Sequence, residues 1–209
     1  MHVVVTGQQP GLLGGPLFTL HKAATAIRLC RELNAEPNGP RVVPVFWNHS
    51  DDHDLEEANR LFLVNSAQEV QRFRLEIDRA GSPLCRVHCG RELERVLAEI
   101  DTLLPQTESR AWALDIFRPR HPDETLAAAQ ARLMFELFGH HGLLVIEPRD
   151  LPDEAFPPLE RWWSQSNKIR DVVRTTCDEL SDLGVDVTMD PAATMMFEIT
   201  SDRRQPLAD

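Results

Sequence analysis

Three carboxylates and an imidazole stand in four consecutive positions, Asp51, Asp52, His53 and Asp54, shortly after an apolar run. Like charges this close repel one another, so the cluster calls for a cation, a ligand amine or a general-base role for one member. We therefore predict Asp52, His53 and Asp54 as catalytic residues and Asp51 as a ligand contact. The structural alternative is that Asp51 caps a helix that begins at Asp52, because acidic side chains favour that position.

A second candidate site is the glycine-rich loop that follows the first apolar run of the chain. Glycines let the backbone approach a ligand closely, and amides at the start of the next helix can bind a phosphate or carboxylate. The spacing matches neither common nucleotide-binding glycine motif, so a purely conformational loop is the alternative. The residues predicted to bind substrate or nucleotide are Gly7, Gln8, Gln9, Gly11, Gly14, Gly15, Thr19 and Lys22.

Each of these loops follows a short strand, so the elements around them should bring the loops together. Consecutive valines predict a buried strand over His2–Thr6, helical spacing predicts a helix over Leu17–Leu33, and a second apolar run predicts a strand over Val42–Trp47. Strand, helix and strand in this order predict a right-handed parallel crossover. Ligands of open α/β sheets bind where such strands end, so we expect the two loops to converge on one site.

The remainder of the chain predicts a single α/β domain over residues 1–209. Its Rossmann-like, mainly parallel sheet should have flanking helices, a small antiparallel insertion at about residues 59–90 and a polar tail over residues 201–209. The other expected elements are antiparallel strands between Leu61 and His88 with a turn at Gly81-Ser82-Pro83, helices over Arg91–Leu104, Pro122–Gly139 and Leu159–Leu183 (the longest), and strands at Leu143–Ile146, Val185–Val187 and Met195–Ile199.

Composition excludes several classes of protein. A formal net charge of -11 argues against a nucleic-acid binder, and no apolar stretch approaches the roughly 20 residues that cross a bilayer. The four cysteines are mostly scattered, which favours a reducing cytoplasm. Cys85, His88 and Cys89 suggest zinc ligands, but a structural zinc normally needs four and no second cluster follows, so we predict no metal.

Two long segments carry a family resemblance: TGQQPGLLGGPLFTLHKAATAI, from Thr6 to Ile27, and VPVFWNHSDDHDLEEAN, from Val43 to Asn59. Two further segments carry a weaker resemblance: LMFELFGHHGLLVIEP, residues 133–148, and MMFEI, residues 195–199. These segments resemble the cysteine-adding enzymes of bacillithiol biosynthesis, although Ser50-Asp51 stands where that family usually has Gly-Glu. The resemblance implies a core related to class I nucleotidyltransferases, of which this chain matches the front half.

The activity implied by the resemblance is a cysteine ligase that joins L-cysteine to the amine of an amino sugar, glucosaminyl-malate. Such a ligation requires an activated carboxyl group, for which ATP is the expected cosubstrate. Since family members are longer, we expect either a split or shortened enzyme, whose core a partner chain or a second copy completes, or a compact relative. The alternative is a non-catalytic subunit that binds a nucleotide or an amino acid.

Overall fold

The computed structural model describes residues 1–190, 196–200 and 203–206. Its contacts divide the chain into two compact units, one built on Met1–Asp150 and the other on Leu151–Thr200. All buried side chains of the described residues lie in the first unit. Length and composition predict a single unit, whereas the contacts form two units, and the buried hydrophobic residues belong to the first.

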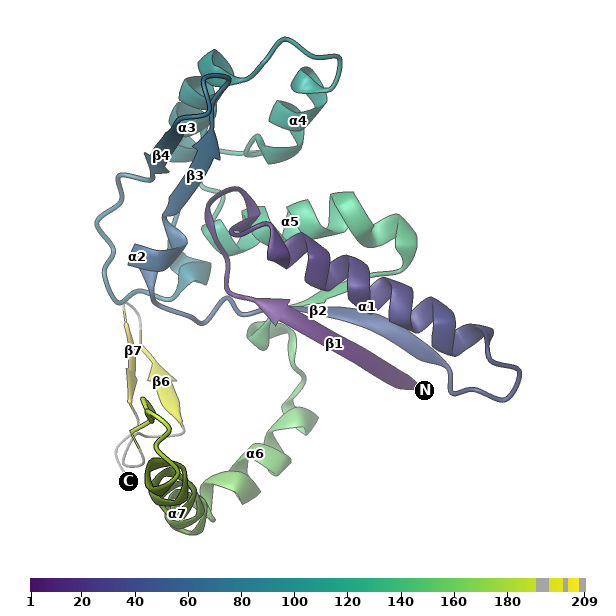
Figure 1. The fold of residues 1–209 in the computed structure, drawn as a ribbon, viewed down its shortest axis with the longest axis vertical. Helices are drawn as coiled ribbons and strands as arrows, with labels where there is room; N and C mark the ends of the chain where they lie inside the picture. Colours follow the sequence, from purple (N-terminus) through teal and green to yellow (C-terminus); the bar gives the residue numbers. More distant parts are fainter. Residues whose placement is uncertain (191–195, 201–202, 207–209) are drawn as a thin grey trace. The chain divides into compact units, whose positions relative to one another are not determined.

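The first unit contains a three-stranded parallel sheet in the order β1-β2-β5 (Figure 1). The strands are β1 (His2–Gln8), β2 (Val42–Asn48) and β5 (Leu144–Ile146), and helix α1 (Phe18–Ala35) connects the first two. The pairing of β1 with β2 runs without interruption from His2 opposite Val42 to Gln8 opposite Asn48. The predicted Rossmann-like parallel sheet and its opening crossover are therefore confirmed, and both strands end at the same level.

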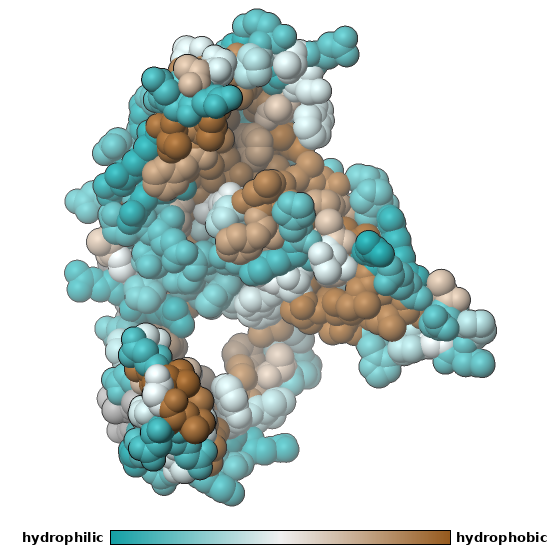
Figure 2. Space-filling model, in the orientation of Figure 1, coloured by the Kyte–Doolittle hydropathy of each residue, from teal (hydrophilic) through white to brown (hydrophobic). Residues whose placement is uncertain are grey.

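Helices cover only one face of this sheet within the first unit. Both α1 and α5 (Leu126–Phe138) pack against β2 and against each other, and they bury Phe46 completely. On the opposite face, Val3, Val5 and Leu144 remain 54%, 58% and 51% exposed, and Figure 2 shows apolar side chains gathered along β1. The prediction of β1 as a buried strand is therefore wrong for the described structure, because β1 is an edge strand with one open face.

The small antiparallel insertion is confirmed, but its turn lies elsewhere than predicted. Strand β3 (Arg60–Val64) pairs with β4 (Val70–Arg74). The Asn65 side chain accepts hydrogen bonds from the amides of Ala67 and Glu69 and so closes the hairpin there. The turn at Gly81 instead lies in the connection to the short 3-10 helix Leu84–Arg86, so the expected further strand before His88 is absent from this described stretch.

Two helices of the first unit match the predictions and one does not. Helix α3 (Gly90–Leu103) agrees with the predicted span, whereas α4 (Arg110–Phe117) was not predicted. Helix α5 begins only at Leu126, because the Thr125 side chain caps it, and it ends at Gly139 as predicted. The acidic segment before Thr125 is a turn that precedes the helix rather than its first turn.

The second unit contains two amphipathic helices and a short hairpin. The predicted helix over Leu159–Leu183 is broken into α6 (Phe156–Trp163) and α7 (Ser166–Asp182), and at 18 residues α1 is longer than either. The Ser164 hydroxyl donates to the Arg161 carbonyl at this break.

Of the two predicted C-terminal strands, one is absent from the described residues and one is present. Val185–Val187 is not a strand, whereas β6 (Phe197–Ile199) confirms the core of the last predicted strand, of which Met195 lies outside the described residues. Part of the predicted tail forms β7 (Arg204–Pro206), which pairs with β6. Residues 201–202 and 207–209 of the tail are not described.

Candidate functional site

The two candidate loops leave the sheet side by side. The backbone amide of His49 donates to the carbonyl of Gln8 at 3.1 Å, directly beyond the last paired residues of β1 and β2. This bond ties the start of the acidic cluster to the start of the glycine loop. The sequence prediction that these loops are neighbours at the carboxyl edge of the sheet is confirmed.

Backbone turns engage two of the three predicted catalytic side chains. Asp52 Oδ1 accepts from the amides of His53 at 2.6 Å and Asp54 at 3.2 Å. Asp54 Oδ1 accepts from the amide of Glu57 at 3.0 Å and caps the four-residue helix α2 (Leu55–Ala58). The helix cap is therefore Asp54 and not Asp51, because the turn closed by Asp52 delays the start of the helix.

His53 lies beside Asp52 in this turn. Its Nδ1 lies 3.7 Å from Asp52 Oδ1, and its side chain is 42% exposed whereas that of Asp52 is 18% exposed. A carboxylate beside an imidazole is an arrangement that can accept a proton from a bound amine. The catalytic assignment of Asp52, His53 and Asp54 remains a prediction.

The glycine loop folds back on itself. Gly14 and Gly15 have φ angles of +87° and +71°, which only glycine adopts readily, and their amides donate to the carbonyls of Gly11 and Leu12. The Gly11 amide donates to Gln130 Oε1 at 3.0 Å. Three amides that could have held an anion are thus already bound to protein oxygens, so they do not form a phosphate cradle in this conformation.

Lys22 lies where the sequence analysis expected a positive charge. Its Nζ donates to the Gly7 carbonyl at 3.2 Å and to Gln8 Oε1 at 2.9 Å, and it lies 4.9 Å from the centre of the Phe18 ring. Lys22 is exposed on α1, so its charge remains accessible at the end of β1. Of the predicted ligand-binding set, Lys22 and Gln8 therefore offer the charged and polar groups at this edge.

Thr19 differs from the other predicted contacts because it is completely buried, and its hydroxyl has no hydrogen-bond partner among the described residues. We expect Thr19→Val to raise the free energy of unfolding by about 1 kcal/mol, since an unsatisfied buried hydroxyl is costly. Urea denaturation measures this change. The matched control is Thr25→Val on the same helix, where the hydroxyl donates to the His21 carbonyl and no stabilisation is expected. A destabilised Thr19→Val chain would contradict this interpretation.

Three polar residues that the sequence analysis missed organise the same edge. Asn48 Nδ2 donates to the Ala127 carbonyl and to Glu147 Oε1, both at 3.0 Å. Glu147 is buried directly after β5, and its other oxygen lies 2.8 Å from Arg149 Nε. Asn48 and Glu147 could have been predicted from the sequence, because each is a polar residue at the end of an apolar strand. The third, Gln130, lies within α5, where its spacing gave no signal.

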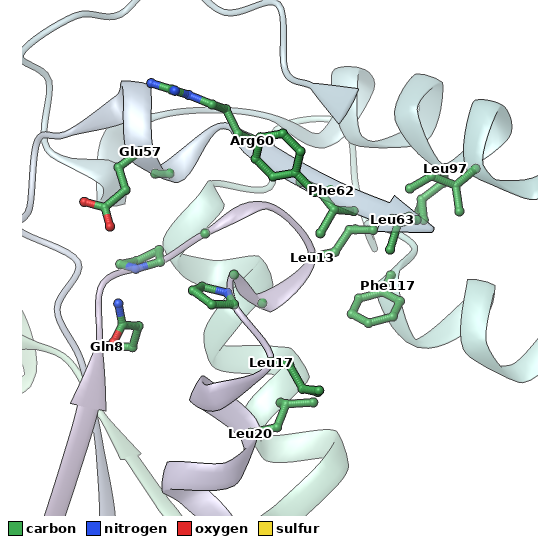
Figure 3. Close-up of a pocket in the computed structure, with 18 of the residues that line it drawn as sticks. Gln8, Leu13, Leu17, Leu20, Glu57, Arg60, Phe62, Leu63, Leu97 and Phe117 are labelled. Carbon is green, nitrogen blue, oxygen red and sulfur yellow. The ribbon is translucent and has the colours of Figure 1, made fainter. Parts of the chain in front are cut away.

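Two hollows flank the Gln8–Gln9 segment. A cavity of about 800 Å³ lies between the glycine loop, β3, α3 and α4, with Gln8 and Glu57 at one end and the apolar Leu97 and Phe117 at the other (Figure 3). A second hollow of about 470 Å³ lies at the ends of β1 and β2 and is lined by Val5, Thr6, Gly7, Gln8, Gln9, Trp47 and His49. The predicted ligand-binding glutamines thus line both hollows.

Of Cys85, His88 and Cys89, Cys89 is buried, Cys85 is half-buried and His88 is exposed. Within the described ranges, no group of three or more His, Cys, Asp or Glu side chains is placed to hold a metal ion. His88 Nδ1 lies 2.8 Å from the Asp123 carbonyl. Burial and the neighbouring Glu124 carboxylate raise the pKa of the Cys89 thiol to about 12. No helix in the described part of the chain has the length and apolar character that crossing a bilayer requires.

Comparison with known proteins agrees with this geometry. The family model of the bacillithiol biosynthesis protein BshC, N-terminal Rossmann-like domain, matches residues 1–209. A protein of Koribacter versatilis named "Putative cysteine ligase BshC" is 33% identical over an alignment of 209 positions that covers 97% of this chain and 38% of that relative. A protein of the same name from Desulforamulus reducens is 39% identical over an alignment of 150 positions that covers 69% of this chain and 27% of the relative.

The chain therefore spans less than two fifths of the length of these curated relatives. The match nevertheless includes both loops at the carboxyl edge of the sheet, since the family model extends over all of them. The chain belongs to the BshC family of bacillithiol biosynthesis and corresponds to its N-terminal Rossmann-like domain.

Proposed function

We propose that this chain forms the front half of the catalytic core of a cysteine ligase that joins L-cysteine to the amine of glucosaminyl-malate. The observation that carries the proposal is the bond between the His49 amide and the Gln8 carbonyl, which brings both family-specific loops to one edge of the sheet. Open α/β sheets bind their ligands at this edge. Family membership supports ligation as the chemistry.

The proposed roles follow from charge. Lys22 and Gln8 bind the anionic part of a substrate, because the Nζ and the amide lie together at the end of β1. Asp52 and His53 orient the acceptor amine and take its proton. In this step the amine nitrogen forms a bond to the activated carboxyl carbon, the bond from that carbon to its leaving group breaks, and the proton passes to the Asp52 and His53 pair.

ATP is the cosubstrate that the family resemblance implies for activating the carboxyl group. The glycine loop does not form a phosphate-binding cradle here, because the amides of Gly11, Gly14 and Gly15 donate their hydrogen bonds to protein oxygens. Lys22 is a cation that the loop region offers to a nucleotide. The proposed step therefore does not include ATP, and the assay is run with and without it.

A partner segment completes the core in this proposal. Apolar residues on both faces of a strand are typical of sheets that are covered on both sides, yet Val3, Val5 and Leu144 are more than half exposed. The free edge of β1 also leaves backbone groups available for another strand. These features favour a second polypeptide segment on this face, and they equally support the alternative of a non-catalytic subunit that binds a nucleotide or an amino acid.

Mass spectrometry of the condensed thiol product tests the proposal. The 209-residue chain is incubated with L-cysteine and glucosaminyl-malate, with and without ATP, alone and together with the remainder of the Koribacter versatilis relative. We expect product that depends on this chain and falls at least about 100-fold in Asp52→Ala, as expected when a general base is lost. The control Glu69→Ala changes an exposed acid in the hairpin turn and should retain activity. Unchanged turnover in Asp52→Ala would refute the assignment, and absence of product under all conditions would favour the non-catalytic subunit.

A further inference from the structure

Gln130 binds the glycine loop from a distant helix. It lies on α5 and is only 1% exposed. Its Oε1 accepts the Gly11 amide at 3.0 Å, and its Nε2 donates to the Gln9 carbonyl at 3.1 Å. The two backbone groups lie two residues apart on the segment that follows β1, so this single amide pairs with the loop as a neighbouring strand would.

We propose that Gln130 is a positioning residue that holds Gln9–Gly11 in the conformation in which the loop binds substrate. This inference rests on the proposed function, since it assumes that the Gln8–Gln9 segment contacts a ligand. Gln9 lines both hollows of the site, and its carbonyl is fixed by Gln130. Loss of the clamp would release the segment whose side chains face the ligand.

The chemistry of the contact requires a group that both donates and accepts. An apolar side chain at position 130 would leave the Gly11 amide and the Gln9 carbonyl unsatisfied. A carboxylate could accept from Gly11 but would repel the Gln9 carbonyl oxygen, whereas a protonated carboxyl group could make both bonds. Gln130→Glu should therefore behave as a pH-dependent version of the native clamp.

The same helix also anchors the neighbouring loop. The Ala127 carbonyl, three residues before Gln130, accepts from Asn48 Nδ2 at 3.0 Å. Leu133, almost one turn after Gln130, lies against Gly14, where an added Cβ would be 2.6 Å from Leu133 Cδ2. Because these contacts remain when Gln130 is changed, the expected effect is local to residues 9–11 rather than a loss of the fold.

The test compares Gln130→Leu and Gln130→Glu with Met134→Leu, a buried residue of the same helix that packs in the core cluster around Phe46. Amide hydrogen exchange at Gly11 is measured in the full chain, and calorimetry measures binding of L-cysteine and of ATP as separate probes. In Gln130→Leu we expect Gly11 to exchange about tenfold faster and the affinity for a bound probe to fall by about the same factor, while Met134→Leu changes neither. Near pH 5, Gly11 exchange and probe affinity in Gln130→Glu should resemble those of the native chain. Near pH 8, they should resemble those of Gln130→Leu.

Distinct outcomes overturn the inference and the proposed function. Unchanged Gly11 exchange in a folded Gln130→Leu chain would refute the clamp. Faster exchange with unchanged probe affinity would reduce Gln130 to a structural residue and refute its positioning role. A native chain that binds neither probe would contradict the proposed function, while Gly11 exchange would still decide the clamp. If Gln130→Leu fails to fold, the ratio of Gly11 exchange in Gln130→Glu to that in the native chain at the same pH provides the same test, and a ratio that does not change between pH 5 and pH 8 refutes the clamp.

Discussion

Arg132→Met should lower the free energy of unfolding by about 3–5 kcal/mol, because it leaves the buried carboxylate of Glu124 without its cation. The side chains of Arg132 and Glu124 are 15% and 5% exposed, and Arg132 Nε lies 2.9 Å from Glu124 Oε1. Arg132 also donates to the Ile116 carbonyl at 2.8 Å, and Glu124 accepts the Arg120 amide at 3.1 Å. The pair therefore joins α5 to α4 and to the turn before α5, and its loss affects all three segments.

Equilibrium unfolding in urea measures this change. The control is Arg28→Met, which removes the cation of an exposed pair with Glu32 and should leave stability unchanged within error. The double variant Arg132→Met/Glu124→Met should recover much of the loss, because it also removes the unpaired charge. A loss below about 1 kcal/mol in Arg132→Met would place this pair among ordinary surface ion pairs and contradict the interpretation.

Gly7→Ala should also be strongly destabilising, by about 3 kcal/mol, because the sheet has no space for a side chain there. A Cβ at Gly7 would lie 2.5 Å from the Trp47 carbonyl oxygen and 2.9 Å from Trp47 Cβ. Gly7 and Trp47 are directly paired, so the clash could be relieved only by moving β1 away from β2. The displacement would also shift the Gly7 carbonyl that accepts from Lys22.

Thermal and urea denaturation of Gly7→Ala test this expectation, with Val5→Ala as the control. Val5 lies two residues earlier on the same face of β1 and is more than half exposed, so its truncation should cost much less. A Gly7→Ala chain of native stability would show that β1 and β2 can separate freely. In that case the glycine would be explained by the predicted ligand contact rather than by strand pairing.

Much of the secondary structure near the start of the chain could be predicted because it depends on neighbouring residues. The valine run of β1, the helical spacing of α1 and the apolar run of β2 indicated a parallel crossover, which the structure confirms. The break between α6 and α7 could not be read in this way, because apolar residues continue at helical spacing on both sides of Ser164. The hairpin turn was misplaced because Gly81 is a stronger sequence signal than Asn65, whose side chain closes the turn.

Local strand and helix patterns are enough to predict from the residues alone that two polar loops follow adjacent parallel strands. The contacts that hold those loops depend on tertiary packing. Gly11 and Gln130 are 119 residues apart, and Asn48 and Glu147 are 99 residues apart. Buried amides and carboxylates find such partners only when the sheet and α5 pack together, so their roles depend on three-dimensional proximity that residue type and spacing do not encode.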